Sequence, residues 1–285
     1  MVIEVTAADP DSVGADLVAV APGARAAELG VPERAAADAD PVALVYRDPG
    51  RSPLAVVPIE ADVEGLRTAA ARAVRACRNG GIVAWALDRT LPLALEEQVR
   101  GLAEGAMLGG YDGRRWRSGE ARPGVERFVI CGCPDELTPV ADRAALVARW
   151  TNTAREMVDA PANLMSPADL SDRVVKFAHL VSEIVDPIRA GLGALTAVGG
   201  SSPIPPRLIV LRHDPPGAPP TPRLALVGKA VTFDTGGYFL KPQSDIVRQK
   251  ADMAGGAAVA AGLGAIAELG LPLKVTGFVP ACENM

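Results

Sequence analysis

Short apolar runs alternate with alanine-rich segments of helical periodicity along the first half of the chain. The apolar runs are IEVT, ADLVAVA, PVALVYR, LAVVPIE, GIVAWAL and FVICG, and the helical segments are GLRTAAARAVRACRNG and residues 93–108. Apolar runs of this length are typical of strands, and their alternation with helices is typical of a sheet covered by helices. We therefore expect residues 1–135 to form one α/β domain.

The second half of the chain repeats this order after a long helical segment. Residues 136–159 have the pattern of an amphipathic helix that links two units. The Ser-Pro pair at 166–167 is typical of a helix start, with serine as the N-cap and proline in the first turn. Strands are predicted at 208–213, 224–231 and 273–281, with an Ala/Gly-rich helix that begins near Asp252. Residues 160–285 are thus predicted to form a second α/β domain.

Composition narrows the class of protein. With 49% hydrophobic and 22% charged residues over 285 positions, the chain has the balance of a soluble globular protein. Its net charge of -5 gives no electrostatic footprint for nucleic acid, and the short basic run 114-RRWR-117 is typical of a solvated surface or a subunit contact. We therefore expect no nucleic-acid partner.

No targeting or membrane segment is visible. The N-terminus lacks a basic region followed by an apolar stretch, and the uncharged Ala/Gly-rich run Met253 to Ala267 is too short to span a bilayer. We expect a cytoplasmic protein with no membrane partner. The pair 131-CGC-133 has no second cysteine cluster or nearby histidines, which favours reduced structural thiols over a zinc site.

The stretch 227-VGKAVTFDTGGYFLKPQSDIVRQKADMAGG-256 includes Lys229, Asp234, Lys241 and Asp252 among its charged residues. Each alone has an ordinary structural explanation, as a strand-end lysine, a turn residue or a carboxylate at a helix start. Together they fall at the boundary between a strand and the helix that follows it. Ligands of open α/β sheets bind at this edge.

The chemistry of these residues suits a pair of divalent cations. Two cations held close together need a bridging carboxylate, and Asp234 precedes two glycines that let the backbone approach a crowded site. A lysine amine also ligates a metal when the cation lowers its pKa. Lys241 would then stabilise negative charge developing on a substrate oxygen.

These residues resemble a known family. VGKAVTFDTGGYFLKP followed by KADMAGGAAV is similar to the signature of the leucyl aminopeptidases, the M17-type cytosolic metallo-exopeptidases. The segments 155-REMVDAPANLMSPADL-170, GALTAVGGSSPIPPRLIVL and AEGAMLGGYDGRRW also resemble this family, so the likeness covers nearly the whole chain. It implies a macro-like α/β domain over 1–135, a linking helix over 136–159 and a zinc-exopeptidase-like domain with a mixed central sheet over 160–285.

The resemblance also implies roles for single residues. Lys229, Asp234 and Asp252 correspond to metal ligands, with Asp234 bridging two cations, and Lys241 corresponds to the lysine that polarises the scissile carbonyl. The expected cofactors are two divalent ions, Zn²⁺ or Mn²⁺ first, with Mg²⁺ and Co²⁺ also chemically suited. The expected substrates are peptides with a free N-terminus, attacked by a metal-activated hydroxide, and the expected assembly is a homohexamer. Glu283 and Asn284 match a family segment that supports the ligands.

The sequence departs from the family pattern at two points. Ala230 stands where a glycine is common, and the later Asn-Thr-Asp-Ala-Glu-Gly-Arg motif, which carries two more carboxylate ligands, is absent. We therefore expect a catalytic domain truncated before its C-terminal part, with little or no peptidase activity. The alternative is a non-catalytic remnant or regulatory protein that forms oligomers or binds a small ligand, of the ADP-ribose type if the macro-like domain supplies the site.

Nucleotide binding through a standard loop is not supported. The run 191-GLGALT-196 lacks the third glycine of the dinucleotide fingerprint, and 228-GK-229 lacks the spacing of a P-loop. The histidines His179 and His213 are isolated in the sequence and are expected to be structural or surface residues.

Overall fold

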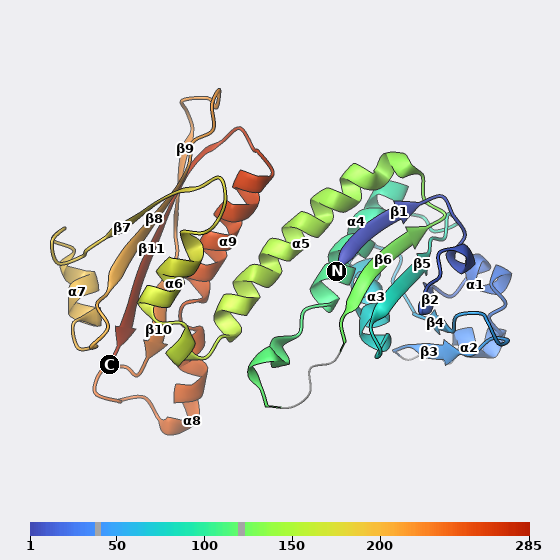
Figure 1. The fold of residues 1–285 in the computed structure, drawn as a ribbon, viewed down its shortest axis with the longest axis horizontal. Helices are drawn as coiled ribbons and strands as arrows, with labels where there is room; N and C mark the ends of the chain where they lie inside the picture. The colour runs from blue at the N-terminus through green and yellow to red at the C-terminus, as the bar shows by residue number, and fades with distance from the viewer. Residues whose placement is uncertain (38–40, 119–122) are drawn as a thin grey trace. The chain divides into compact units, whose positions relative to one another are not determined.

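The computed structural model describes residues 1–37, 41–118 and 123–285, which fold as two compact units (Figure 1). The first unit comprises residues 1–112 and 118–149, and the second comprises residues 113–117 and 150–285. The division falls inside the helix α5 (Thr138–Asp159), which occupies the segment with the long helical pattern.

A six-stranded sheet forms the centre of the first unit, in the order β1-β6-β5-β2-β4-β3. Its strands run in parallel except for the edge strand β3, which pairs with β4 in the antiparallel sense. The strands are β1 (Val2–Thr6), β2 (Leu17–Val20), β3 (Ala43–Val45), β4 (Leu54–Val56), β5 (Gly81–Ala86) and β6 (Val125–Cys131).

Two long helices pack against each other in this unit because one of them presents glycines to the other. A side chain at Gly105 of α4 would place its Cβ 2.0 Å from the carbonyl oxygen of Arg67 in α3, and Gly101 and Gly109 are similarly close to α3. The helices of the first unit are α1 (Ala24–Glu28), α2 (Glu33–Ala37), α3 (Val63–Ala76), α4 (Leu95–Gly109) and the 3₁₀ turns η1 (Pro10–Ser12) and η3 (Asp135–Leu137).

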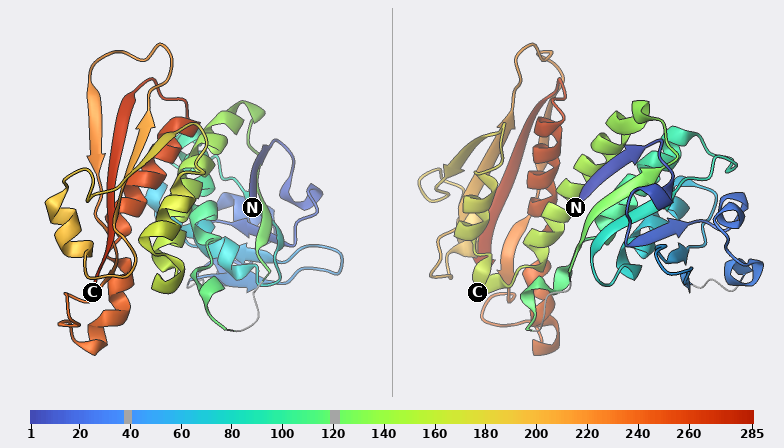
Figure 2. Two further views of the ribbon diagram at one scale, coloured as in Figure 1. Left: turned by 60° about the vertical axis from the view of Figure 1, so that its left-hand side comes forward. Right: turned by 45° about the vertical axis from the view of Figure 1, so that its right-hand side comes forward.

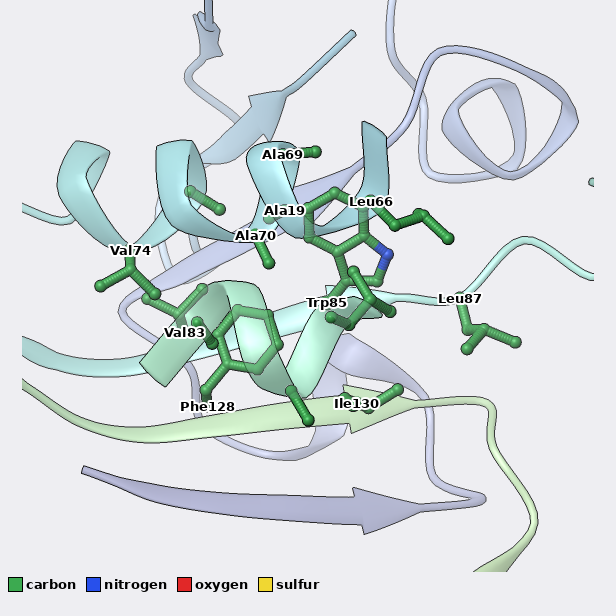
Figure 3. Close-up of a cluster of buried hydrophobic side chains, with 14 of the residues drawn as sticks. Ala19, Leu66, Ala69, Ala70, Val74, Val83, Trp85, Leu87, Phe128 and Ile130 are labelled. Carbon is green, nitrogen blue, oxygen red and sulfur yellow. The ribbon is translucent and has the colours of Figure 1, made fainter. Parts of the chain in front are cut away.

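The core of the first unit lies between the sheet and these helices. Figure 3 shows Trp85 of β5 beside Leu66 and Ala70 of α3, with Phe128 of β6 in the same cluster. All four side chains are at least 98% buried. Burial of large apolar side chains is the main favourable term in folding, so the parallel strands are held by their contact with α3 and α4.

A five-stranded mixed sheet forms the centre of the second unit, in the order β10-β11-β8-β7, with β9 also paired to β11. Both β9 and β10 run parallel to β11, whereas β8 is antiparallel to β11 and to β7. The predicted mixed α/β fold is confirmed. The strands are β7 (Val181–Val185), β8 (Arg207–His213), β9 (Arg223–Val227), β10 (Ala230–Asp234) and β11 (Lys274–Asn284).

Helices lie on both faces of this second sheet (Figure 2). A Cβ at Gly277 of β11 would approach the α9 side chains of Leu263 and Val259, whereas one at Gly199 of α7 would approach Cys282 of β11. The helices of the second unit are α6 (Pro167–Val174), α7 (Gly193–Gly199), α8 (Gln243–Ile246), α9 (Ala254–Glu268) and the 3₁₀ turns η2 (Gly113–Trp116), η4 (Ala162–Leu164) and η5 (Val247–Ala251). None of the helices in the described part of the chain has the length and apolarity needed to cross a membrane.

Local chemistry accounts for several element boundaries. Ser166 caps α6 by accepting a hydrogen bond from the Asp169 amide, and the Asp169 carboxylate accepts one from the Ser166 amide in return, which confirms the predicted helix start. The predicted single strand over 224–231 is wrong, because Gly228 and Lys229 separate β9 from β10. The predicted helix near Asp252 begins two residues later, at Ala254.

Candidate metal centre

The strand β10 ends at Asp234, and the loop after it brings Lys241 back to this residue. Gly236 and Gly237 have φ angles of 83° and 79°, which glycine adopts without the steric cost of a side chain. The Lys241 amide then donates to the Thr235 carbonyl oxygen at 3.0 Å. As a result, Lys241 Nζ donates a hydrogen bond to Asp234 Oδ2 at 2.5 Å.

Three hydrogen-bond donors hold the Asp234 carboxylate. Besides Lys241, the Gly236 amide donates to Oδ1 at 2.9 Å, and Asn284 Nδ2 donates to the same oxygen at 2.8 Å. Burial raises the pKa of Asp234, but these donors, together with the neighbouring Asp252 carboxyl, lower it more, to about 2. The Asp234 side chain is therefore ionised at neutral pH although only 11% of it is exposed.

Lys229 and Asp252 meet because glycines allow the first turn of α9 to contact the start of β10. A Cβ at Gly228 would lie 2.3 Å from the Gly255 carbonyl oxygen, so no larger residue fits there. The Gly256 amide donates to the Lys229 carbonyl oxygen at 2.7 Å. This backbone contact places Lys229 Nζ 2.8 Å from Asp252 Oδ2.

The departure at position 230 is accommodated by the same contact. Ala230 is fully buried, and a Cβ at Gly256 of α9 would lie only 2.7 Å from the Ala230 side chain. The methyl group of Ala230 therefore fits because the residue opposite it has no side chain.

The ion pair between Lys229 and Asp252 is more exposed and less well hydrogen-bonded than the ion pair between Asp234 and Lys241. The Asp252 carboxylate raises the pKa of Lys229, whose side chain is 60% exposed. Asp252 Oδ2 is buried and, within the described residues, accepts no hydrogen bond of good geometry despite its short distance from Lys229 Nζ. A buried carboxylate oxygen without a well-directed donor is costly, and a cation satisfies it well.

The donor set fits a divalent cation in part. The carboxylates of Asp234 and Asp252 offer hard oxygen ligands, and Lys229 offers an amine once it has lost its proton. Among the residues that the structure describes, no three histidine, cysteine, aspartate or glutamate side chains gather as a metal site. Two carboxylates and two ammonium groups instead neutralise one another as ion pairs.

The structure also shows the contacts of three residues that were not predicted as metal ligands. Gln249 Oε1 accepts a hydrogen bond from Lys241 Nζ at 2.8 Å, and the sequence offered no signal for this contact beyond the position of Gln249 shortly before Asp252. Asn284 contacts Asp234 directly. Glu283, in contrast, accepts its hydrogen bond from the Ser202 hydroxyl, at 2.6 Å.

The other candidate ligands are not among the described residues that hydrogen-bond to this cluster. His179 is exposed in a loop, and His213 is buried with Nε2 2.9 Å from the Leu271 carbonyl oxygen. The cysteines Cys131 and Cys133 form no disulfide, and burial raises their thiol pKa values to about 12 and about 11. Both thiols are therefore protonated at neutral pH, as expected for structural cysteines.

The sequence and the fold both match known aminopeptidases. Residues 152–285 match the catalytic domain of the cytosol aminopeptidase family. A probable cytosol aminopeptidase of Nitratidesulfovibrio vulgaris is 34% identical over 96% of this chain and 59% of its own length, and one of Cutibacterium acnes is 38% identical over 79% of this chain and 45% of its own. The chain thus spans about half the length of the curated relatives that it matches.

Solved structures give the same result. The bottromycin maturation enzyme BotP in complex with Mn superposes with a TM-score of 0.80 at 34% identity, over 95% of this chain and 60% of its own. A mutant of tomato leucine aminopeptidase superposes with a TM-score of 0.84 at 26% identity, over all of this chain and 63% of its own. On these matches, residues 152–285 are a catalytic-domain segment of the cytosol aminopeptidase family.

Proposed function

We propose that the second unit supplies part of the active site of a metal-dependent aminopeptidase that releases N-terminal amino acids, of the leucine type, from peptides. The observation that carries the proposal is the cluster of Asp234, Asp252, Lys229 and Lys241 at the end of β10 and before α9. Its location inside the catalytic-domain match and the Mn complex of BotP support a metal-binding role for it.

Lys229, Asp234 and Asp252 are the proposed metal ligands, with Asp234 bridging two cations. Divalent cations bound there would supply Lewis acidity and a lowered pKa for water. Asp234 is already ionised, because its pKa is about 2. Lys229 has to lose a proton before its amine can ligate, and Asp252 raises the pKa of Lys229, so metal binding is expected to release a proton.

Lys241 is the proposed catalytic residue. Its ammonium group is shared between Asp234 and Gln249, at 2.5 and 2.8 Å. If Asp234 held a cation, the Lys241 ammonium would be released from this carboxylate. Lys241 could then donate a hydrogen bond to the scissile carbonyl oxygen and stabilise the negative charge that develops on it.

We further propose that this 285-residue chain by itself holds fewer than two cations and hydrolyses little peptide. Two carboxylates and one amine are too few ligands for two ions that each prefer four or more. Substrates with a free N-terminus, a cytosolic location and assembly as a homohexamer are proposed from the names and family of the relatives. Light scattering on the purified chain tests the assembly.

Metal analysis after dialysis against Mn²⁺ or Zn²⁺, with hydrolysis of leucine p-nitroanilide measured on the same samples, tests the site. We expect less than two ions per chain, weak turnover, and loss of both in Asp234→Asn. The exposed Asp245→Asn in α8 is the matched control and should retain the metal. Two ions per chain with rapid turnover would overturn the partial-site proposal, and no specific metal binding would overturn the metal centre.

A non-catalytic role is the second candidate. The two ion pairs leave the cluster without net charge when no metal is bound, which is compatible with a purely structural arrangement. If this role is correct, Mn²⁺ and Zn²⁺ will bind Asp234→Asn and the unchanged chain equally, and the function will depend on small-ligand binding elsewhere in the chain.

A further inference from the structure

A cavity of about 310 Å³ lies at the carboxyl edge of the sheet in the first unit. Its walls come from residues that follow four of the parallel strands: Ala7 after β1, Ala24 after β2, Leu87, Asp88 and Arg89 after β5, and Gly132 after β6. The chain leaves β2 toward β4 and leaves β5 toward β6, in opposite directions along the sheet. A crevice between two such strands is where open α/β sheets bind ligands, and its volume is at the lower end of about 300–1,000 Å³ for small-molecule sites.

One carboxylate oxygen of Asp88, a residue in the wall of this cavity, has no protein donor among the described residues. Asp88 is 4% exposed, and its Oδ1 accepts hydrogen bonds from the Thr90 amide at 2.8 Å and the Thr90 hydroxyl at 2.6 Å. In the described chain, no donor reaches Asp88 Oδ2. Gly23 has a φ angle of 150°, and a Cβ there would lie 3.1 Å from this oxygen, so glycine keeps the space beside it open. A ligand with an N–H or O–H group would satisfy the oxygen.

Around the cavity, one negative and one positive side chain have no ion-pair partner among the described residues and are available to a ligand. Arg25 is occupied by Asp9 and Glu28, at 2.9 and 2.7 Å. Arg89 donates from Nε and Nη2 to the Gly132 carbonyl oxygen at 3.3 and 2.8 Å, and no described acceptor takes its remaining guanidinium hydrogens. Asp88 Oδ2 and the Arg89 guanidinium are thus a negative and a positive group that form no ion pair within the described protein.

A zwitterion complements this arrangement better than an anion or a neutral sugar does. A phosphate group would gain Arg89 but would be repelled by the Asp88 carboxylate, and a sugar would leave the guanidinium without a counter-charge. The remaining walls from Ala7, Ala24 and Leu87 are apolar and suit an aliphatic side chain. We propose that this cavity binds a free α-amino acid with an aliphatic side chain, its ammonium group on Asp88 and its carboxylate on Arg89.

The binding step does not depend on the proposed peptidase function. If that function holds, the ligand is also a product of the reaction, so the first unit would bind what the second unit releases. The two sites are then separable by substitution, because Asp88 and Arg89 belong to the first unit and Asp234 belongs to the second.

Isothermal titration of the full chain with L-leucine, in the presence of a chelator, tests the proposal. L-leucinamide lacks the carboxylate and N-acetyl-L-leucine lacks the ammonium group, and we expect each to bind about tenfold or more weakly than L-leucine, because each loses one charge-assisted hydrogen bond. This comparison uses the unchanged chain, so it is independent of whether any variant folds.

Substitutions then locate the site. Asp88→Asn and Arg89→Gln should each weaken L-leucine binding about tenfold or more, whereas the exposed controls Asp142→Asn and Arg78→Gln should not change it. Asp234→Asn should leave it unchanged as well. Circular dichroism checks that each variant is folded, and Gly23→Ala provides a second test by narrowing the cavity beside Asp88.

Three results would overturn the proposal: no binding of L-leucine at millimolar concentration, equal binding of the three compounds, or undiminished binding in folded Asp88→Asn. Loss of L-leucine binding in Asp234→Asn with retention in Asp88→Asn would place the ligand in the second unit and also reject it. Failure of the metal-binding test with Asp234→Asn leaves this result untouched, so the two proposals fail separately.

Discussion

The two units each place charged residues at the carboxyl edge of parallel strands, but they pair these charges differently. In the second unit, Lys241 pairs with Asp234 and Lys229 lies against Asp252, so all four charges are engaged with one another. In the first unit, Asp88 and the outer face of Arg89 remain without a protein partner of opposite charge among the described residues. On the two proposals, the first edge would bind its ligand without rearranging an ion pair, whereas the second would bind a cation only if a lysine left its carboxylate.

The largest difference in stability between the two sheet edges is expected when Asp234 or Asp88 is replaced by alanine. Asp234→Ala leaves the Lys241 ammonium, 29% exposed, without its carboxylate, and removing one partner of a mostly buried ion pair costs about 2–4 kcal/mol of unfolding free energy. Asp88→Ala removes two hydrogen bonds to Thr90 and costs about 1–2 kcal/mol. Urea unfolding of both variants measures the difference, and equal losses would contradict the view that only the second edge is self-paired.

The second-largest effect is expected from low pH, which should lower the stability of the second unit. The folded pKa of Asp234 is about 2, below the ordinary value of 3.8, so its stabilising contribution is present above about pH 4 and is lost as the pH falls toward 2. A shift of this size corresponds to about 2 kcal/mol. Unfolding free energies measured at successive pH values should fall between about pH 4 and pH 2 in the unchanged chain and in Asp142→Asn. The fall should be smaller in Asp234→Asn. An equal loss of unfolding free energy in Asp234→Asn would assign the acid sensitivity to other carboxylates.

A smaller loss of stability is expected when an uncharged hydrogen-bond donor to either carboxylate is removed. Asn284→Ala removes one hydrogen bond to Asp234 and should cost about 1 kcal/mol, raise the pKa of Asp234 and weaken Mn²⁺ binding about tenfold. Thr90→Ala removes the hydroxyl donor to Asp88 at a similar cost but should leave Mn²⁺ binding unchanged. Mn²⁺ titration and urea unfolding of the two variants distinguish a role at the metal from a role in folding alone.

The smallest change in stability is expected at Lys229. Its side chain is 60% exposed, and exposed ion pairs contribute about 0–1 kcal/mol, so Lys229→Met should hardly change the unfolding free energy. If the Lys229 amine ligates, however, the same variant should lose Mn²⁺ affinity and release fewer protons on metal binding. Calorimetry in buffers of different ionisation enthalpy measures the protons, and unchanged proton release would remove Lys229 from the ligand set.

The strands that form the two sheet edges were largely predictable, because their apolar runs are bounded by turn residues. The stretch around Lys229 and Asp234 could be chosen as a site from charge placement at a strand end. The break between β9 and β10 was missed because Gly228 lies inside an apolar run, and β7 was missed because the exposed residues of VSEIV carry little apolar pattern.

The pairing of the charges was not predictable from one sequence. Whether Lys229 contacts Asp234 or Asp252 depends on the approach of Gly255 and Gly256 to the start of β10, which is a tertiary contact. The cavity at Asp88 was overlooked for a similar reason. Its only local signal is an aspartate directly after the buried run GIVAWAL, and the residues that complete the walls come from three other strand ends.

The parallel pairing of β10 with β11 also makes the candidate metal centre depend on a contact between distant parts of the chain. Asp234 lies opposite Asn284, 50 positions further along the chain, and the Thr235 amide donates to the Asn284 carbonyl oxygen at 2.9 Å. Contacts of such long sequence separation form late, because the intervening chain must first be ordered. We therefore expect the Asp234 cluster to be completed only when β11 pairs with β10, and a fragment that ends before β11 would lack the Asn284 contacts to Asp234 and Thr235.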